Sequence, residues 1–413
     1  MKTYKQLESI KSSRLLFLIT WLAYAAAYVG RLNFSASLAT IIDQGVFTKS
    51  QAGLIGTVFF FCYGGGQLIS GIIADKLSPY KLIFTGLTLS VFANFLMYTS
   101  RNYILMSVIW GFNGIAQSML WAPVLFIISN ILHQDIRYKA CLYIASSNVV
   151  GTLIAYIIAA ICSEFKWNII FIISSVIMSV VTVIWVIVSS KIPMTTEITE
   201  HQNIITEPRI KFNKLLILSG VIIMMIPVMI HGMLKEGIMT WVPTMITETY
   251  KVTPTFSIFI SMILPIINLC GAYIASYLFE KITKRHEIIT SVYLMSFIII
   301  PLIVLLFIGN IPLLICIAML ALTTMTMHAF NYVYITLVPM RFRKYNATAT
   351  VTGIFNSIAY VGCAISNFGF GWLSDVFGWK NSIFFWIGIA VFAVIICLFV
   401  IKRWSKFTDV SPQ

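Results

Sequence analysis

The chain alternates long apolar runs with short polar breaks along its whole length. The runs measure about 20 residues, the length at which a helix crosses the hydrocarbon core of a bilayer. This pattern predicts an all-α membrane protein with twelve membrane-spanning helices, at residues 15–40, 51–74, 82–99, 103–132, 140–162, 167–190, 215–247, 255–279, 288–308, 312–338, 346–373 and 380–401.

One polar segment is longer than the other breaks and lies near the middle of the chain. It predicts an N-terminal six-helix bundle, a cytoplasmic linker and a C-terminal six-helix bundle, with boundaries at 1–190, 191–214 and 215–413. The two halves also repeat: Arg31 corresponds to Lys235 at an offset of 204 residues, and Asp75 to Glu280 at an offset of 205. Two repeated halves related by an axis along the membrane normal are typical of secondary transporters, which bind substrate between the repeats near the midplane.

Composition and charge agree with this architecture. Hydrophobic residues make up 59% of the 413 residues and charged residues only 10%, a balance that soluble domains do not have. The net charge of +14 could indicate nucleic-acid binding, but 21 of the 28 lysines and arginines fall on the side of the expected membrane that holds both termini. This bias predicts cytoplasmic termini and argues against a nucleic-acid partner.

Other features exclude further classes. The N-terminal apolar run is too long for a signal peptide and is expected to be retained. The seven cysteines form no CxxC pair, so we expect no disulfide framework, metal or cofactor. A membrane enzyme should carry intramembrane acid–base clusters, whereas Glu236 is the lone intramembrane carboxylate and His231 and His328 lie on different helices. No channel filter motif is evident, so we expect neither an enzyme nor a channel.

Two cations lie deep in predicted spans: Arg31 in "AYVGRLNFSAS" and Lys235 in "HGMLKEGIMTWVP". A charge at this depth costs at least ~2.5 kcal/mol on insertion scales, and it usually faces a cavity and serves function. The alternative is a buried ion pair with Glu236. Glu236 follows Lys235 directly and would point ~100° away around a regular helix, so we favour an anion-binding role for both cations.

Polar residues at helical spacing accompany the two cations. These stripes could equally hold helices together, but together they indicate an amphipathic pocket for a small hydroxylated anion. Their members are Tyr24, Tyr28 and Ser35 with Arg31; His231 with Lys235; Asn113, Gln117 and Trp121; and Asn356, Tyr360 and Asn367.

The segment "GGGQLISGIIADK" (64–76) ends the second predicted span. Its small residues, including Gly71, permit close helix contact. Asp75 and Lys76 could form a gate latch, or could be a plain solvated helix end.

"GIIADK" resembles the loop signature of the major facilitator superfamily. "YVGRLNF", "WAP" (121–123), "SNVVG" (147–151), "KEGIMTWVPT" (235–244) and "GFGWLSDVFGW" (369–379) resemble, more narrowly, the organophosphate:phosphate antiporter family of glycerol-3-phosphate and hexose-6-phosphate transporters. The resemblance implies that Arg31 and Lys235 hold the substrate phosphate, although that family has arginine at the second position. It also places Gln67 and Ser147 where the glycerol-phosphate branch has lysine and histidine.

The expected function is therefore exchange of a phosphate ester for inorganic phosphate in a bacterial inner membrane, by a monomer that rocks one half against the other. Two alternatives remain open. One is proton-coupled symport of a phosphonate, sulfonate or carboxylate, with Glu236 as the proton carrier or as charge balance for Lys235. The other is a membrane sensor that binds sugar phosphate.

Overall fold

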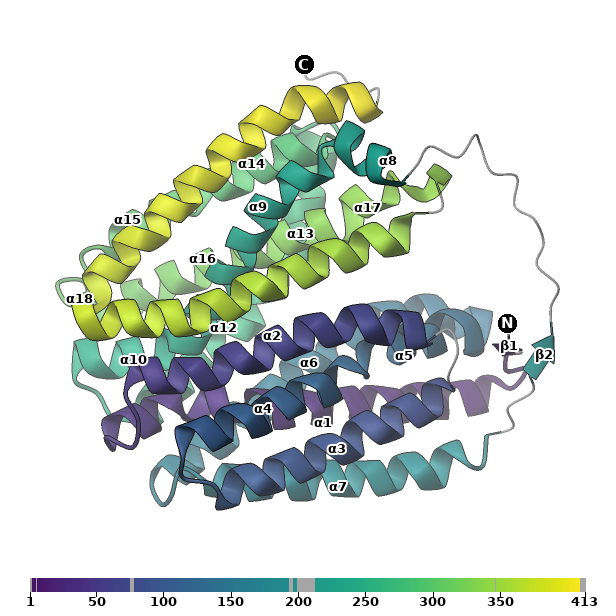
Figure 1. Ribbon diagram of the computed structural model, residues 1–413, viewed down its shortest axis with the longest axis horizontal. Helices are drawn as coiled ribbons and strands as arrows, with labels where there is room; N and C mark the ends of the chain where they lie inside the picture. The colour runs from purple at the N-terminus through teal and green to yellow at the C-terminus, as the bar shows by residue number, and fades with distance from the viewer. Residues whose placement is uncertain are drawn as a thin grey trace. The chain divides into compact units, whose positions relative to one another are not determined.

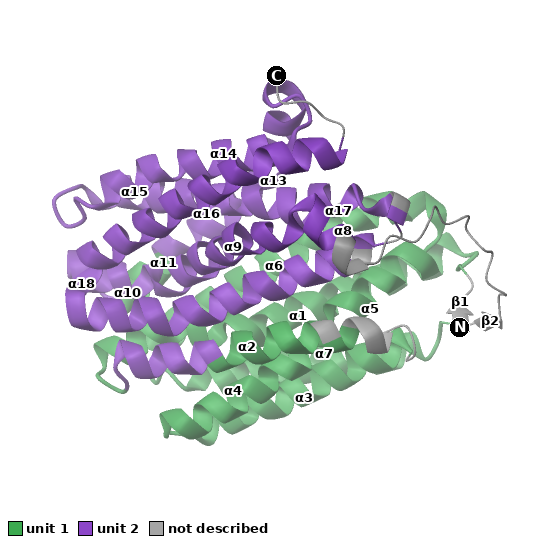
Figure 2. Ribbon diagram, turned by 45° about the horizontal axis from the view of Figure 1, so that its top comes forward, with its two compact units in different colours: residues 1–46, 58–203, 254–259 green, residues 47–57, 204–253, 260–413 purple. Residues whose placement is uncertain are grey.

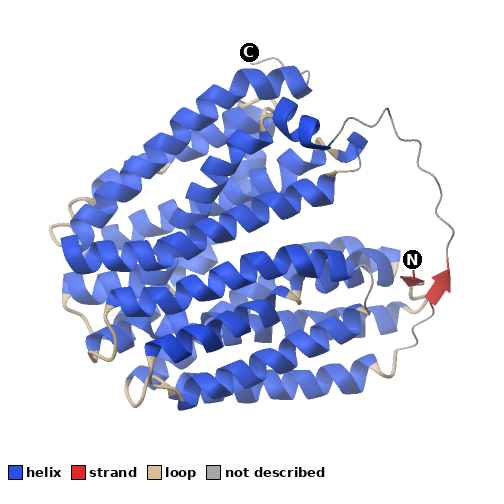
Figure 3. Ribbon diagram, viewed as in Figure 1, coloured by secondary structure: helices blue, strands red, loops and turns tan. Residues whose placement is uncertain are grey.

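The computed structural model describes residues 2–4, 6–74, 78–192, 196–198, 212–345 and 347–408. Helices make up almost all of this part of the chain (Figure 3). Among the described residues, the exception to the predicted all-α class is a pair of antiparallel three-residue strands, in which Thr3 pairs with Glu197.

The chain divides into two compact units, shown in Figure 2. Unit 1 comprises residues 1–46, 58–203 and 254–259, and unit 2 comprises 47–57, 204–253 and 260–413. Each unit therefore takes most of one predicted half and a short piece of the other. Helix α2 is shared, because its first residues belong to unit 2 and the remainder to unit 1.

The first half of the chain contains the following elements (Figure 1): β1 (Lys2–Tyr4), α1 (Ile10–Asp43), α2 (Lys49–Ala74), α3 (Pro79–Thr99), α4 (Tyr103–Ser118), α5 (Trp121–Phe126), the π-helical turn η1 (Ile127–Ile131), α6 (Gln134–Ser163), α7 (Ile169–Ser189) and β2 (Thr196–Ile198).

The second half contains α8 (Phe212–Ser219), α9 (Val221–Gly232), the π-helical turn η2 (Met233–Gly237), α10 (Ile238–Tyr250), α11 (Pro254–Ser261), α12 (Ile263–Asn268), α13 (Cys270–Tyr277), η3 (Leu278–Ile282), α14 (Glu287–Phe297), α15 (Ile299–Leu305), α16 (Leu313–Tyr332), η4 (Val333–Leu337), α17 (Val338–Met340), η5 (Arg343–Tyr345) and α18 (Thr348–Thr408).

Ten helical stretches in the described residues are long and apolar enough to cross a membrane. The last of them, Thr350–Thr408, covers the final two predicted spans, and Gly378 interrupts it with φ 77° and ψ 171°, angles that glycine adopts readily. Helix α2 coincides with the second predicted span. The count of twelve and the cytoplasmic placement of the termini remain predictions.

The sides of many helices present large apolar residues to the surroundings. Examples are Leu18, Phe61, Val108, Leu314 and Phe399, whose side chains are between 52% and 77% exposed. A monomeric soluble protein rarely exposes apolar surface on this scale, so these faces are suited to lipid.

In unit 1, buried amides fasten α1 to α3 and α4. Asn94 and Asn113 each donate to the backbone oxygen of Gly30 at 3.1 Å, and Gln117 donates to that of Ala27 at 3.2 Å. Asn113 and Gln117 are at most 4% exposed. Asn113 and Gln117 therefore join helices, which is the alternative that the sequence left open for this stripe, and their lining of a pocket stays a prediction. The bonds fix the backbone of α1 next to Arg31.

In unit 2, glycines let α9 approach α18 closely. A Cβ at Gly232 would lie 2.0 Å from the backbone oxygen of Ala359, and a Cβ at Gly362 would lie 2.0 Å from that of Met229. No side chain fits at these distances, so the crossing depends on both glycines.

Gly362→Ala should lower the free energy of unfolding of unit 2 by ~1–3 kcal/mol, because the added methyl overpacks the crossing. Gly388→Ala is the matched control on the same helix, since nothing lies within 4 Å of its added Cβ. There the better helix propensity of alanine should raise stability by up to ~1 kcal/mol. Thermal unfolding of the purified variants measures both changes, and equal midpoints for the two would refute the close crossing.

Candidate functional site

The site residues predicted from the sequence fall into two groups, one in each unit. Arg31 lies near the middle of α1 in unit 1, and Lys235 lies in the π-helical turn η2 of unit 2. Each group is described by its own contacts.

Arg31 is buried, with 6% of its surface exposed, and aromatic rings surround its guanidinium. Its central carbon lies 4.2 Å from the ring centre of Tyr63, 5.4 Å from that of Tyr28, and 5.6 and 5.7 Å from those of Phe59 and Phe60. A cation within about 6 Å of a ring centre is attracted to the negative face of the ring. Aromatic rings carry no net charge, so these contacts stabilise the cation without cancelling its charge.

The aromatic contacts extend along unit 1 beyond Arg31. The rings of Tyr24 and Tyr28 are 5.3 Å apart, and Tyr24 lies 4.9 Å from Trp121. At the other end, the amide of Gln67 donates to the hydroxyl of Tyr63 at 2.8 Å. We call the set Tyr24, Tyr28, Arg31, Phe59, Phe60, Tyr63, Gln67 and Trp121 the Arg31 cluster. It unites five of the six site residues predicted for the first half.

Ser147 is the sixth, and no described contact joins it to the cluster. It is fully buried on α6, and its hydroxyl donates to the backbone oxygen of Ile144 at 2.6 Å. One turn further along α6, Gly151 packs against α1, where a Cβ would lie 2.6 Å from Cβ of Tyr28. Ser147 therefore lies on the helix that supports the cluster.

Phe59, Phe60 and Tyr63 were missed from the sequence. They lie in the run "TVFFFCYGGG" (57–66), which resembles ordinary apolar packing, and only the fold shows that α2 faces Arg31. The helical spacing of Tyr63 and Gln67 was the available signal.

In unit 2, Lys235 forms an ion pair with Glu236. Their side-chain Nζ and Oε1 atoms are 2.9 Å apart, and the two side chains are only 18% and 21% exposed. The prediction that Glu236 points too far away to pair is therefore wrong. The π-helical turn departs from the regular helix on which the 100° step was based, and the two long side chains bend toward each other.

Two histidines interact with this pair. His231 and His328 each interact electrostatically with both Lys235 and Glu236. His231 is 1% exposed and stacks on Phe330 at 5.4 Å between ring centres. The two histidines lie on different helices, α9 and α16, as the sequence indicates, and their shared interactions with Lys235 and Glu236 could not be foreseen from it. We call His231, Lys235, Glu236 and His328 the Lys235 cluster.

Asn356 and Tyr360 lie one turn apart on α18 and are partly exposed. Helix α18 packs along η2 in this region, and a Cβ at Gly237 would lie 2.6 Å from the hydroxyl of Ser366. Both residues thus lie on the helix that supports the Lys235 cluster. Of the residues predicted for a gate, Gly71 lies in α2, and Asp75 and Lys76 lie outside the described residues.

A second feature missed from the sequence is an ion cluster at the start of α2, within unit 2. Lys49 Nζ lies 2.9 Å from a carboxylate oxygen of Glu248 on α10 and 3.7 Å from one of Asp375 on α18. The indole of Trp379 donates to Glu248 at 2.6 Å, and Ser50 donates to Asp375 through both its backbone and its hydroxyl. We call these five residues the Lys49 cluster.

Curated relatives with known names match parts of the chain. The membrane sensor protein UhpC of Salmonella typhimurium is 27% identical over 38% of this chain and 36% of its own length. A "probable hexose phosphate transport protein" of Chlamydia pneumoniae is 26% identical over 37% and 34%. The glycerol-3-phosphate transporter of Bacillus subtilis is 22% identical over 66% of each chain. The match thus spans only about a third of the length of the first two relatives. The resemblance to the organophosphate:phosphate antiporter family is confirmed.

The fold matches a solved structure over nearly its whole length. A bacterial homolog of the human lysosomal transporter Spinster, in an inward-facing and unoccupied conformation, superposes with a TM-score of 0.81 over 97% of this chain and 99% of its own, at 13% identity. The family model of the Major Facilitator Superfamily matches residues 16–367. This multi-pass membrane protein therefore belongs to the Major Facilitator Superfamily.

Proposed function

We propose that the chain is a secondary transporter that exchanges a small phosphate ester for inorganic phosphate across a bacterial inner membrane, with both termini in the cytoplasm. The observation that carries this proposal is the buried guanidinium of Arg31 inside a ring of aromatic side chains. The exchange reaction, its direction and the orientation in the membrane are part of the proposal.

The chemistry of the Arg31 cluster suits a sugar phosphate or glycerol phosphate. A guanidinium presents a planar set of N–H donors that matches two oxygens of a phosphate. The neighbouring tyrosines and Trp121 combine an apolar face with a polar tip, which suits the carbon skeleton and hydroxyls of the same ligand. The hexose phosphate and glycerol-3-phosphate proteins among the relatives support this substrate class.

The Lys235 cluster supplies the second cation in this proposal. Lysine offers a point charge instead of a fork, and here it is already paired with Glu236. An arriving phosphate must therefore compete with a carboxylate for Lys235. We propose that substrate binding displaces Glu236, which then turns to a new partner such as a hydroxyl of the substrate.

Alternating access requires that the two units move relative to each other, and we propose that α2 constrains that motion. The helix belongs to both units, and the Lys49 cluster anchors its first turn to α10 and α18. We propose that the Lys49 cluster is a latch at the outer end, and that it must release in one half of the transport cycle.

The exchange reaction is tested directly in vesicles that contain the purified protein. Vesicles loaded with inorganic phosphate should accumulate labelled hexose phosphate or glycerol phosphate, and empty vesicles should not. Phosphonates, sulfonates and carboxylates serve as competitors that define the anion class. Equal uptake into loaded and empty vesicles would exclude obligatory exchange.

Arg31→Lys should abolish most exchange, because the charge remains but the planar fork is lost. Tyr63 gives a graded pair of variants. Tyr63→Phe keeps the ring over Arg31 and should retain most activity. Tyr63→Leu removes the ring and should reduce exchange about tenfold, as expected for a desolvated cation–π contact worth ~1–2 kcal/mol. Initial rates at equal protein amounts measure the series, and equal rates for the Phe and Leu variants would show that the ring does not position Arg31.

Proton symport is the second candidate, because Glu236 is half of a partly buried ion pair that interacts electrostatically with two histidines. Glu236→Gln separates the two mechanisms. In symport, the neutral side chain should block uptake driven by a pH gradient and leave substrate counterflow intact. In exchange, counterflow and net exchange should change together. Both rates are measured on the same vesicles, and loss of the pH-driven rate alone would contradict the exchange proposal.

Lys49→Gln should weaken the latch. The reporter is Ser374→Cys, placed at a side chain that is 4% exposed beside Asp375. With Lys49 removed, a membrane-impermeant maleimide should label this cysteine several-fold faster, and high salt should have the same effect because it screens partly exposed ion pairs. Lys251→Gln is the matched control, an exposed lysine at the end of α10. Equal labelling in both variants would mean that the Lys49 cluster does not hold this end closed.

A sensor function is a third candidate, since a match with this chain is a membrane sensor protein. A sensor should bind sugar phosphate tightly, with an Arg31-dependent rise in thermal stability, yet fail to accumulate it in loaded vesicles. That combination would replace transport with sensing at the same site.

A further inference from the structure

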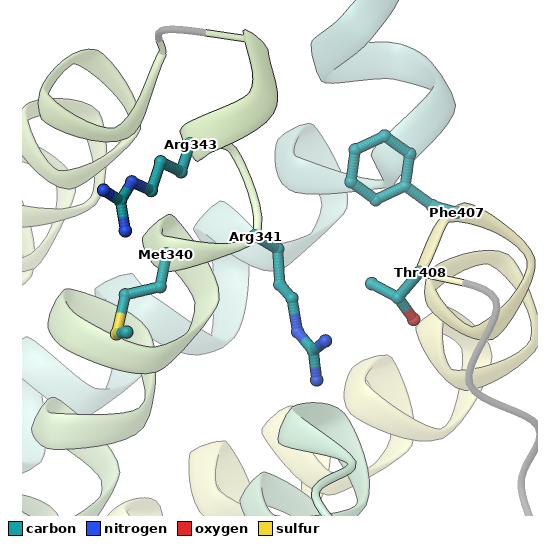
Figure 4. Close-up of a pocket in the computed structure, with 5 residues that line it drawn as sticks. All are labelled: Met340, Arg341, Arg343, Phe407 and Thr408. Atoms are coloured by element: carbon teal, nitrogen blue, oxygen red, sulfur yellow. The ribbon is translucent and has the colours of Figure 1, made fainter.

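We propose that unit 2 carries a second anion site, which binds the phosphate group of a lipid headgroup or of a free phosphate ester. The site is a cavity of about 460 Å³ lined by Met340, Arg341, Arg343, Phe407 and Thr408 (Figure 4). None of these residues belongs to the Arg31, Lys235 or Lys49 cluster. The proposal therefore stands whether or not the chain exchanges phosphate.

Arg341 is held in place by two hydrogen bonds. Its Nε donates to a carboxylate oxygen of Glu287 at 2.6 Å, and its Nη2 donates to the backbone oxygen of Arg285 at 3.1 Å. The carboxylate of Glu287 is itself fixed, because its side chain is 2% exposed and its other oxygen accepts from the indole of Trp404 at 2.9 Å. Arg341 is thus anchored through the ends of α14 and α18.

This anchoring leaves binding capacity on Arg341. A guanidinium has five N–H donors, and the two bonds above use two of them. The side chain of Arg341 is 34% exposed, so the remaining donors are open to a ligand. A fixed arginine loses little conformational entropy when it binds a ligand. Arg341 should therefore bind a phosphate more tightly than an exposed arginine that is not held in place.

Arg343 and the apolar wall complete the site. Figure 4 shows the side chain of Arg341 between those of Met340 and Thr408, and the side chain of Arg343 extending above Met340, away from Phe407. Met340 is 60% exposed, and Phe407 packs on Phe342 at 5.3 Å between ring centres. A lining that combines two cations with apolar side chains suits a ligand with a phosphate and a hydrocarbon or glycerol portion.

The size and position of the cavity also favour a ligand such as a lipid headgroup. Its volume corresponds to roughly fifteen water molecules at ~30 Å³ each, more than inorganic phosphate alone requires. The cavity lies where the candidate spans Leu313–Met340 and Thr350–Thr408 end, the level at which lipid headgroups meet a membrane protein.

The surrounding charge favours an anion. Two segments that precede residues of the site in the sequence carry exposed basic residues. Lys281, Lys284 and Arg285 come before Glu287, and Lys402, Arg403 and Lys406 come before Phe407. Among the described residues of these segments, the exposed acid is Glu280. A basic pocket between helix ends at one side of the membrane attracts anionic headgroups.

The test uses the purified full chain in detergent, with Arg343→Gln as the variant and Lys406→Gln as the control. Lys406 is an exposed cation next to Phe407 that does not line the cavity, so both variants lose one charge from the same surface. Thermal unfolding is measured with phosphatidylglycerol, with phosphatidylcholine, with inorganic phosphate, and with no addition. Retained lipids are counted by native mass spectrometry.

The site predicts that phosphatidylglycerol raises the unfolding midpoint of the wild type more than phosphatidylcholine does. Arg343→Gln should reduce the number of retained anionic lipids at least threefold, and Lys406→Gln should behave like the wild type. If inorganic phosphate produces the same Arg343-dependent rise, the ligand is a free phosphate; if only phosphatidylglycerol does, it is a lipid. Arg341→Lys provides a second variant, which keeps a cation beside Glu287 but lacks the planar fork of a guanidinium, and should also lose binding.

Two outcomes would overturn the proposal. One is that neither ligand stabilises the protein in a way that depends on Arg343 or Arg341. The other is that Lys406→Gln loses as much binding as Arg343→Gln, which would mean that diffuse surface charge attracts the anions. A response that survives in Arg31→Lys separates this site from the proposed transport site.

Discussion

The burial of one guanidinium inside a membrane span is the constraint on which unit 1 depends. Placing an arginine at this depth costs several kcal/mol, and the fold offsets this with four aromatic rings around Arg31. The rings come from α1 and α2, so both helices must hold their relative positions. The amides of Asn94, Asn113 and Gln117 contribute by fixing the backbone of α1 on α3 and α4. A hydrophobic side chain at residue 31 would need none of this support, which is the physical reason why we propose Arg31 as a binding residue.

Much of the fold could be predicted from the sequence because lipid and helix geometry leave few alternatives. A span must satisfy its own backbone hydrogen bonds, so runs of about 20 apolar residues indicate helices without further information. The sequence could not indicate where those helices touch. The crossing at Gly232 and Gly362 and the exchange of short segments between the two units depend on distant parts of the chain. The two short strands also escaped prediction, because three residues carry too little periodicity.

In the candidate site, too, the sequence indicates individual residues but does not indicate which distant residues they contact. Arg31 and Lys235 stand out in the sequence because a charge within an apolar run is rare. The aromatic partners of Arg31 do not, because phenylalanine and tyrosine are ordinary residues of a span. The stripe of Asn113 and Gln117 shows the converse ambiguity, since polar residues on one helical face can bind a neighbouring backbone as well as a ligand. Lys49, Glu248 and Asp375 lie about 200 and 130 residues apart in the chain, and only their packing shows that they form one cluster.

The ion pair between Lys235 and Glu236 changes the electrostatic basis of the proposed exchange. Two unpaired cations would make closure of an empty carrier costly, because like charges repel strongly where water is excluded. With Glu236 beside Lys235, that cost is smaller, since the carboxylate supplies the counter-charge that a substrate phosphate would otherwise bring. Obligatory exchange then requires a different source of coupling: the empty carrier must be unable to close for a reason other than repulsion between its cations. In our proposal the Lys49 cluster holds the outer end closed, so an empty carrier that has closed there would not reopen without substrate.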